Sequence, residues 1–142
     1  MNEAVWYELR NAVYAKEFEI AESLLKANPH LIDLRDGLGE TVLHFLAVEN
    51  DVEGVAWLHD RGFDLDTKNK CGTPVIFEVA QLGYKDLILW FAQRGVNFLA
   101  LDRDGQDILS NLREYEKGDV AQFLVENVPN LALQVTPASG RA

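Results

Sequence analysis

The sequence predicts an all-α fold in which helix-turn-helix units of 33 residues stack side by side into a solenoid. Between residues 36 and 101 one pattern occurs twice, and the second copy is displaced by 33 positions. A fixed period of roughly 20 to 50 residues is typical of stacked repeats. The recurring residues are Gly39 and Gly72, Val42-Leu43 and Val75-Ile76, Ala47 and Ala80, Trp57 and Trp90, and Gly62 and Gly95.

The first unit is expected at residues 3–35, as a cap on the end of the stack. Apolar residues between Glu8 and Ala27 fall at helical spacing in two pieces, with a break near residues 15–17. Asn28-Pro29 ends the second piece, because a residue before proline avoids the helical region. Polar residues between the apolar ones indicate a solvated outer side, which an end repeat needs.

The second unit, residues 36–68, shows each element most clearly. A turn is expected at Asp36-Gly37-Leu38-Gly39, and Thr41 is a candidate N-cap for a helix from Val42 to Val48. A second helix is expected from about Val52 to Asp60. Gly62 then stands where a residue in the left-handed conformation ends a helix.

The remaining units repeat this order with fewer signals. Residues 69–101 form the third unit, and residues 102–133 keep the apolar pattern as a fourth. The fourth unit lacks the helix-ending glycine and has Val128-Pro129 instead, as expected of a C-terminal cap. Residues 134–142 are expected to form a flexible tail.

Two segments resemble the ankyrin-repeat family. Residues 41–47, TVLHFLA, are similar to the family signature T-P-L-H-x-A, and residues 62–66, GFDLD, resemble its ending G-A-D-V-N. In the third unit Thr73-Pro74 falls one position early, and Phe77 stands where His44 stood. The resemblance covers about residues 8–133. It implies an ankyrin solenoid of four units with degenerate ends, whose function is protein binding.

The length and composition of the chain limit the possible functions. The chain has 142 residues, 48% of them hydrophobic, which suits one domain with a core. The single cysteine, Cys71, excludes an internal disulfide and a thiolate metal cluster. The N-terminal segment does not have the order of a signal peptide, and no apolar run approaches the roughly 18 residues of a membrane span. We therefore expect a cytoplasmic protein without cofactors that does not bind membranes.

The charge balance is strongly acidic. The chain carries 13 Lys and Arg against 23 Asp and Glu, a net charge of −10, and residues 33–66 alone hold nine acids and two bases. Direct binding of nucleic acid is disfavoured, because phosphate neutralisation requires clustered Lys and Arg. An acidic face attracts a basic protein partner, but a need for solubility explains the acidity equally well.

No enzyme or metal motif is present. His44 lies inside the repeat signature and is expected to make structural hydrogen bonds. His59 and Asp60 are neighbours on a helix and do not face each other. Residues 102–105 lack the order of a calcium loop, and neither H-E-x-x-H nor a glycine-rich nucleotide loop occurs. We therefore expect no catalysis and no metal site, with Cys71 an exposed bystander.

The large aromatic residues are expected in the core. Trp57 and Trp90 occupy equivalent positions on second helices, with Leu24 one repeat earlier and Phe123 one repeat later. A stack of bulky residues at one repeat position is typical of packing rather than of ligand binding.

The resemblance also implies where a partner binds. In ankyrin stacks the projecting loops and first helices line a concave groove. Apolar, aromatic and charged side chains are mixed there, as on a protein-binding surface with Leu38, Leu82 and Tyr115 as anchors. The partner-binding residues expected by position are Leu38, Glu40, Glu49, Lys68, Lys70, Thr73, Gln81, Leu82, Arg103, Asp104, Glu114 and Tyr115.

The first functional hypothesis is stoichiometric protein binding by a monomer. A compact, acidic ankyrin chain resembles bacterial immunity proteins, some of which are built from ankyrin repeats. It would then bind and neutralise a basic toxin or enzyme. One alternative is a general adaptor or effector module that links proteins. Another is a small enzyme that uses groove carboxylates such as Glu49 and Glu114.

Overall fold

The computed structural model describes residues 3–129 and 131. Within that part of the chain, eight α-helices and one short 3-10 helix are present, and residues 134–142, the expected tail, lie outside it. The elements are α1 Glu3–Tyr14, α2 Phe18–Ala27, η1 Pro29–Ile32, α3 Val42–Val48, α4 Val52–Asp60, α5 Val75–Gln81, α6 Lys85–Gln93, α7 Ile108–Glu114 and α8 Gly118–Asn127.

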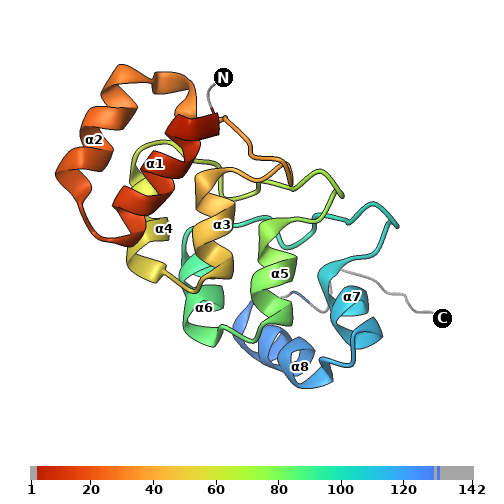
Figure 1. Ribbon diagram of the computed structural model, residues 1–142. Coiled ribbons are helices and arrows are strands. Elements are labelled where there is room, and N and C mark those ends of the chain that lie inside the picture. The colour runs from red at the N-terminus through yellow and green to blue at the C-terminus, as the bar shows by residue number, and fades with distance from the viewer. Residues whose placement is uncertain (1–2, 130, 132–142) are drawn as a thin grey trace.

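The helices are arranged in pairs that stack along one direction (Figure 1). The first helices of the pairs, α1, α3, α5 and α7, follow one another in an inner row, and α2, α4, α6 and α8 form an outer row. Consecutive members of the inner row contact each other. The connections from one pair to the next project on one side. This arrangement confirms the predicted all-α repeat solenoid, while the exact borders of the four units stay a prediction.

The second pair forms as the sequence predicts. Helices α3 and α4 have the expected bounds, and the hydroxyl of Thr41 accepts a hydrogen bond from the His44 N–H at 3.3 Å. Asp51 caps α4, because its carboxylate accepts from the Gly54 N–H at 3.1 Å. Gly62 has a φ of 100° after the end of α4, as expected of a left-handed terminator.

Helix α1 begins at Glu3, five residues before the expected start at Glu8. The prediction of its start was wrong because the helical spacing of its buried face begins with Trp6, outside the segment used for the prediction. Trp6 and Leu9 are fully buried. The Trp6 indole N–H also donates to the Glu40 carbonyl oxygen at 3.1 Å, which fixes the first pair to the loop before α3.

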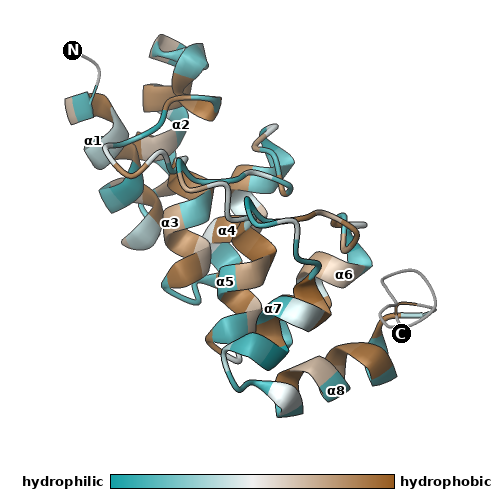
Figure 2. Ribbon diagram, turned by 90° about the vertical axis from the view of Figure 1, so that its right-hand side faces the viewer, coloured by the Kyte–Doolittle hydropathy of each residue, from teal (hydrophilic) through white to brown (hydrophobic). Residues whose placement is uncertain are grey.

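One continuous apolar core runs through the stack. Residues such as Leu43, Leu46, Ile76, Val79 and Leu112 on the inner helices are fully buried, within 1% exposure. Figure 2 shows that most helices carry apolar residues on part of their surface and polar residues on the rest. Each pair therefore buries its apolar sides against the neighbouring pairs.

The two repeated tryptophans lie at the margin of this core. Trp57 and Trp90 are half-buried and pack against it from the outer helices, as Leu24 and Phe123 do. The Trp57 ring stacks on Phe18 at a centroid distance of 5.3 Å, and the Arg61 guanidinium covers it at 3.9 Å. The expectation of core positions is thus met only in part, because a cationic side chain and solvent take the place of a further apolar layer.

The projecting loops are tied to one another at the repeat period. The Arg35 guanidinium donates to the Lys68 carbonyl at 2.7 Å, and the Lys68 ammonium donates to the Leu101 carbonyl at 3.1 Å. The Lys70 N–H also donates to the Leu38 carbonyl at 3.1 Å. Cationic side chains therefore connect three successive loops at positions separated by 33 residues.

Gly39 lies where the loop before α3 meets the loop before α5, and it provides a test of this contact. Its φ is 76°, and a Cβ at this residue would lie 2.6 Å from the backbone nitrogen of Lys70. We predict that Gly39→Ala lowers the free energy of unfolding by about 2 kcal/mol or more, because it adds left-handed strain to a backbone clash. Urea denaturation measures the change.

Gly37→Ala is the matched control, two residues away in the same turn. Gly37 has open space around its Cα and no positive φ, so this change should stay within about 0.5 kcal/mol of the parent protein. Equal stability of the two variants would contradict the proposed loop contact.

Candidate protein-binding site

One hydrogen-bonded turn shapes each projecting loop. Asp36, Asn69 and Asp102 lie 33 residues apart, and the Oδ1 atom of each accepts two backbone N–H groups, two and four residues further on. The donors are Leu38 and Glu40 at 3.0 and 3.0 Å, Cys71 and Thr73 at 2.9 and 3.1 Å, and Asp104 and Gln106 at 2.9 and 2.9 Å. Such side-chain turns hold a loop without a helix or sheet partner.

An open cavity lies between the inner helices α5 and α7 and the two loops before them. Its lining is mainly polar and includes three carboxylates, one guanidinium, an exposed thiol and one tyrosine. The lining residues are Asn69, Cys71, Thr73, Glu78, Gln81, Asp102, Arg103, Asp104, Asn111 and Tyr115.

Hydrogen bonds between side chains fix the floor of this cavity. The Gln81 amide donates to Asn111 Oδ1 at 2.8 Å, and the Asn111 amide donates to Asp102 Oδ2 at 3.3 Å. The Asn69 amide likewise donates to Glu78 Oε2 at 3.1 Å. The cavity floor is thus ordered without a ligand, which lowers the entropy cost of binding one.

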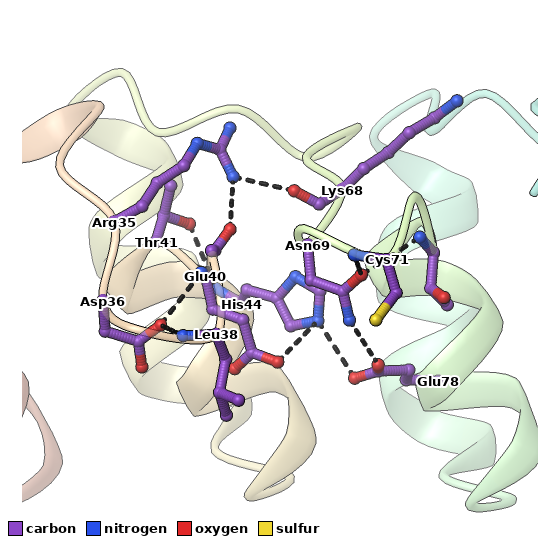
Figure 3. A network of polar contacts seen from close by, with 12 residues as sticks. Arg35, Asp36, Leu38, Glu40, Thr41, His44, Lys68, Asn69, Cys71 and Glu78 are labelled. Atoms are coloured by element: carbon purple, nitrogen blue, oxygen red, sulfur yellow. Dashed lines mark hydrogen bonds and ion pairs between the residues drawn. The ribbon is translucent and has the colours of Figure 1, made fainter. Parts of the chain in front are cut away.

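A buried polar cluster lies next to the cavity (Figure 3). His44 is fully buried, and its Nε2 lies 3.0 Å from Glu78 Oε1 and 3.6 Å from Glu40 Oε2. Burial raises the pKa of the Glu40 carboxyl above its usual value; His44 opposes this shift, and the charges of Glu78 and Asp36 add to it. His44 therefore joins α3 to α5 through a carboxylate, in agreement with the structural role expected for it.

Five of the twelve expected partner-binding residues line the cavity together: Thr73, Gln81, Arg103, Asp104 and Tyr115. Six others are exposed outside it: Leu38, Glu49, Lys68, Lys70, Leu82 and Glu114. The Lys68 ammonium among these is already bound to a neighbouring loop. Glu40 is only 9% exposed and belongs to the buried cluster rather than to the open surface. Whether these residues bind a partner stays a prediction.

The acids of residues 33–66 are spread over α4 and the loops around α3 and α4. Asp36, Glu40, Asp51, Asp64 and Asp66 are each used in local contacts, such as the Asp51 ion pair with Lys16 at 2.7 Å. The exposed acids that remain are Asp33, Glu49, Glu53 and Asp60, of which the last two lie on α4. The cavity lining contributes three further carboxylates, those of Glu78, Asp102 and Asp104.

Several cavity residues were missed by the sequence reasoning. Glu78, Asn69, Asp102 and Asn111 were not among the expected site residues. The 33-residue recurrence of Asp36 at Asn69 and Asp102 could have identified the loop turns. Glu78 offered no such signal, because the equivalent residue one repeat earlier is Phe45.

The comparisons with known proteins agree with this geometry. The family model described as ankyrin repeats in many copies matches residues 43–92. Together with the stack of helix pairs, this match shows that residues 43–92 form ankyrin repeats. Ankyrin repeats are protein-interaction modules, so protein binding is the class of function that the fold defines.

One curated relative is the E3 ubiquitin-protein ligase hecd-1 of Caenorhabditis elegans. It is 24% identical to this chain over 117 residues, which are 82% of the chain but 4% of the ligase. The chain thus spans a small fraction of that relative's length. In addition, none of the helices described between residues 3 and 129 has the length and apolar character needed to cross a membrane.

The Asp102 turn provides a test of how the cavity is held in shape. We predict that Asp102→Ala lowers the free energy of unfolding by about 1–3 kcal/mol, because two backbone N–H groups and the Asn111 amide lose their acceptor. Faster hydrogen exchange of the Gln106 amide should accompany the loss. Asp104→Ala, which removes an exposed carboxylate from the same loop, should stay within about 0.5 kcal/mol and leave that exchange rate unchanged.

Proposed function

We propose that this chain is an inhibitor, of the immunity-protein type, that binds one basic protein with one-to-one stoichiometry and neutralises it. The observation that supports this most directly is the pairing of exposed anchors with a carboxylate-lined cavity. Leu82 and Tyr115 follow α5 and α7 at equivalent repeat positions and are 49% and 58% exposed. The binding requires no catalysis by this chain.

The charge of the cavity favours a cationic contact. Glu78, Asp102 and Asp104 contribute carboxylates there, and Arg103 contributes the opposite charge. A partner that presents Arg or Lys would place it among these carboxylates, where a bidentate guanidinium contact is strong. The net charge of −10 further speeds the encounter with a basic protein at low salt.

The two anchors would supply the apolar part of the contact. Exposed large side chains at the centre of an interface, surrounded by polar groups, are typical of binding hot spots. Leu38, 59% exposed on the loop before α3, extends the same surface toward the second pair. In the cytoplasm, where we place the encounter, Cys71 would remain a free thiol.

The decisive experiment measures both capture and inhibition. The full chain, immobilised at low salt, is expected to retain one dominant basic protein from the lysate of its source cell at one-to-one stoichiometry. The purified partner should then lose its enzymatic or toxic activity when the chain is added in equal amount. A partner whose activity is unaffected would contradict the inhibitor proposal and favour an adaptor that links proteins.

Variants of the two anchors test the surface itself. Leu82→Ala and Tyr115→Ala should each weaken binding of that partner by about tenfold or more, since a central anchor contributes about 1–2 kcal/mol or more. Ile20→Ala is the matched control, because Ile20 is 53% exposed on the outer helix α2. Isothermal titration calorimetry measures the three affinities. Equal weakening by Ile20→Ala would place the interface on another face.

A further inference from the structure

The buried cluster of Glu40, His44 and Glu78 has the arrangement of a metal-binding site. One oxygen from each carboxylate and one ring nitrogen of His44 all lie within 4.8 Å of one another. The residues come from two adjacent repeats, since Glu40 and His44 flank the start of α3 and Glu78 lies on α5. Figure 3 shows the three side chains pointing toward a common centre.

The two distances from His44 to the carboxylates are close to those between ligands of a small transition-metal ion. Zn²⁺ binds nitrogen and carboxylate oxygen at about 2.0–2.2 Å, so two ligands of a tetrahedral site lie roughly 3.3–3.5 Å apart. His44 Nε2 lies 3.0 Å from Glu78 Oε1 and 3.6 Å from Glu40 Oε2. Shifts of a few tenths of an ångström would bring both pairs to the tetrahedral separation.

The charges in the cluster favour a cation. Two carboxylates face a single imidazole in a place where His44 is fully buried and Glu40 is 9% exposed. Asp36 adds a further carboxylate nearby, since its Oδ1 accepts the Glu40 N–H at 3.0 Å. A divalent ion would offset the repulsion between the two carboxylates.

The surroundings would orient one ligand and leave access for the ion. The Asn69 amide holds Glu78 Oε2 at 3.1 Å, so Oε1 is directed at His44, as an outer-shell partner would do. Glu78 and Asn69 also line the open cavity, which provides a path for the ion and room for a water ligand. The His44 Nδ1 is buried without a hydrogen-bond partner among the described residues, which weakens the site relative to a fully supported one.

We propose that Glu40, His44 and Glu78 bind one Zn²⁺ ion, which joins the second helix pair to the third and leaves a coordination position open toward the cavity. Nε2 would bind the metal through its lone pair, so the ring proton would lie on Nδ1, and each carboxylate would contribute one oxygen. Mg²⁺ and Ca²⁺ are not expected there, because they prefer sites made of oxygen ligands alone. The proposal is independent of the inhibitor function.

The first test is a titration of the tag-free full chain after treatment with a chelator. We expect one Zn²⁺ per chain in a competition assay with a chromogenic chelator. Free Zn²⁺ at about a hundred times its Kd should raise Tm by roughly 5–10 °C. Mg²⁺ at the same concentration should leave Tm unchanged. The absence of saturable one-to-one Zn²⁺ binding would overturn the proposal.

Variants assign the binding to this cluster. Glu78→Gln keeps the size of the side chain and its ability to hydrogen-bond to Asn69. It should lower Zn²⁺ affinity by more than about a hundredfold, since changes beyond the ligands already cost roughly tenfold to a hundredfold. The control is the double variant His30→Gln/His59→Gln, which removes the other two histidines. The double variant should keep the Zn²⁺ affinity of the parent protein. A loss of affinity in the double variant, or an unchanged affinity in Glu78→Gln, would overturn the assignment.

A measurement on the unaltered chain covers the case in which Glu78→Gln does not fold. Long-range ¹H–¹⁵N NMR spectra report the two ring nitrogens of each histidine. Zn²⁺ should shift the Nε2 signal of His44 and leave His30 and His59 unchanged. A shift confined to His30 or His59 would show that the ion binds elsewhere and would overturn the proposal.

Discussion

Contact between neighbouring helix pairs is the interaction on which the whole structure depends. The inner helices α3, α5 and α7 have seven residues each, well below the roughly 12–15 residues at which an isolated helix becomes even marginally stable in water. Their buried residues belong to one core that passes through every pair. No pair can therefore form alone, and the 33-residue period keeps each apolar face in register with the next.

Polar contacts recur at the same period. Because hydrogen bonds are directional, they fix the orientation of neighbouring repeats, which apolar packing alone does not. The loop turns at Asp36, Asn69 and Asp102 set the loop shape, and Arg35 and Lys68 each donate to the loop that follows. Between the inner helices, a side chain of one repeat reaches a polar side chain of the next. His44 meets Glu78 in one case, and Gln81 meets Asn111 in the other.

The parts of the structure that could be predicted from the sequence are those that recur. The bounds of α3 and α4 follow from Thr41, the apolar spacing and Gly62, because local signals determine where a short helix begins and ends. The burial of Trp6 and the position of Glu78 could not be predicted in this way. Each depends on a contact more than thirty residues away, such as the Trp6 bond to the Glu40 carbonyl.

Repeat positions that hold the loops together differ from repeat positions that face solvent, and this difference explains how one scaffold could both stay folded and bind a partner. Where a side chain holds the loops together, the repeat keeps its chemistry, as at Asp36, Asn69 and Asp102. Where a side chain only points outward, successive repeats differ, and Glu49 is followed by Leu82 and Tyr115 at equivalent places. The change from a carboxylate to apolar groups along this row places the exposed apolar area next to the cavity between α5 and α7. A partner held by both features would have to contact the third and fourth helix pairs, whose relative position is set by the same stacking that makes the helices stable.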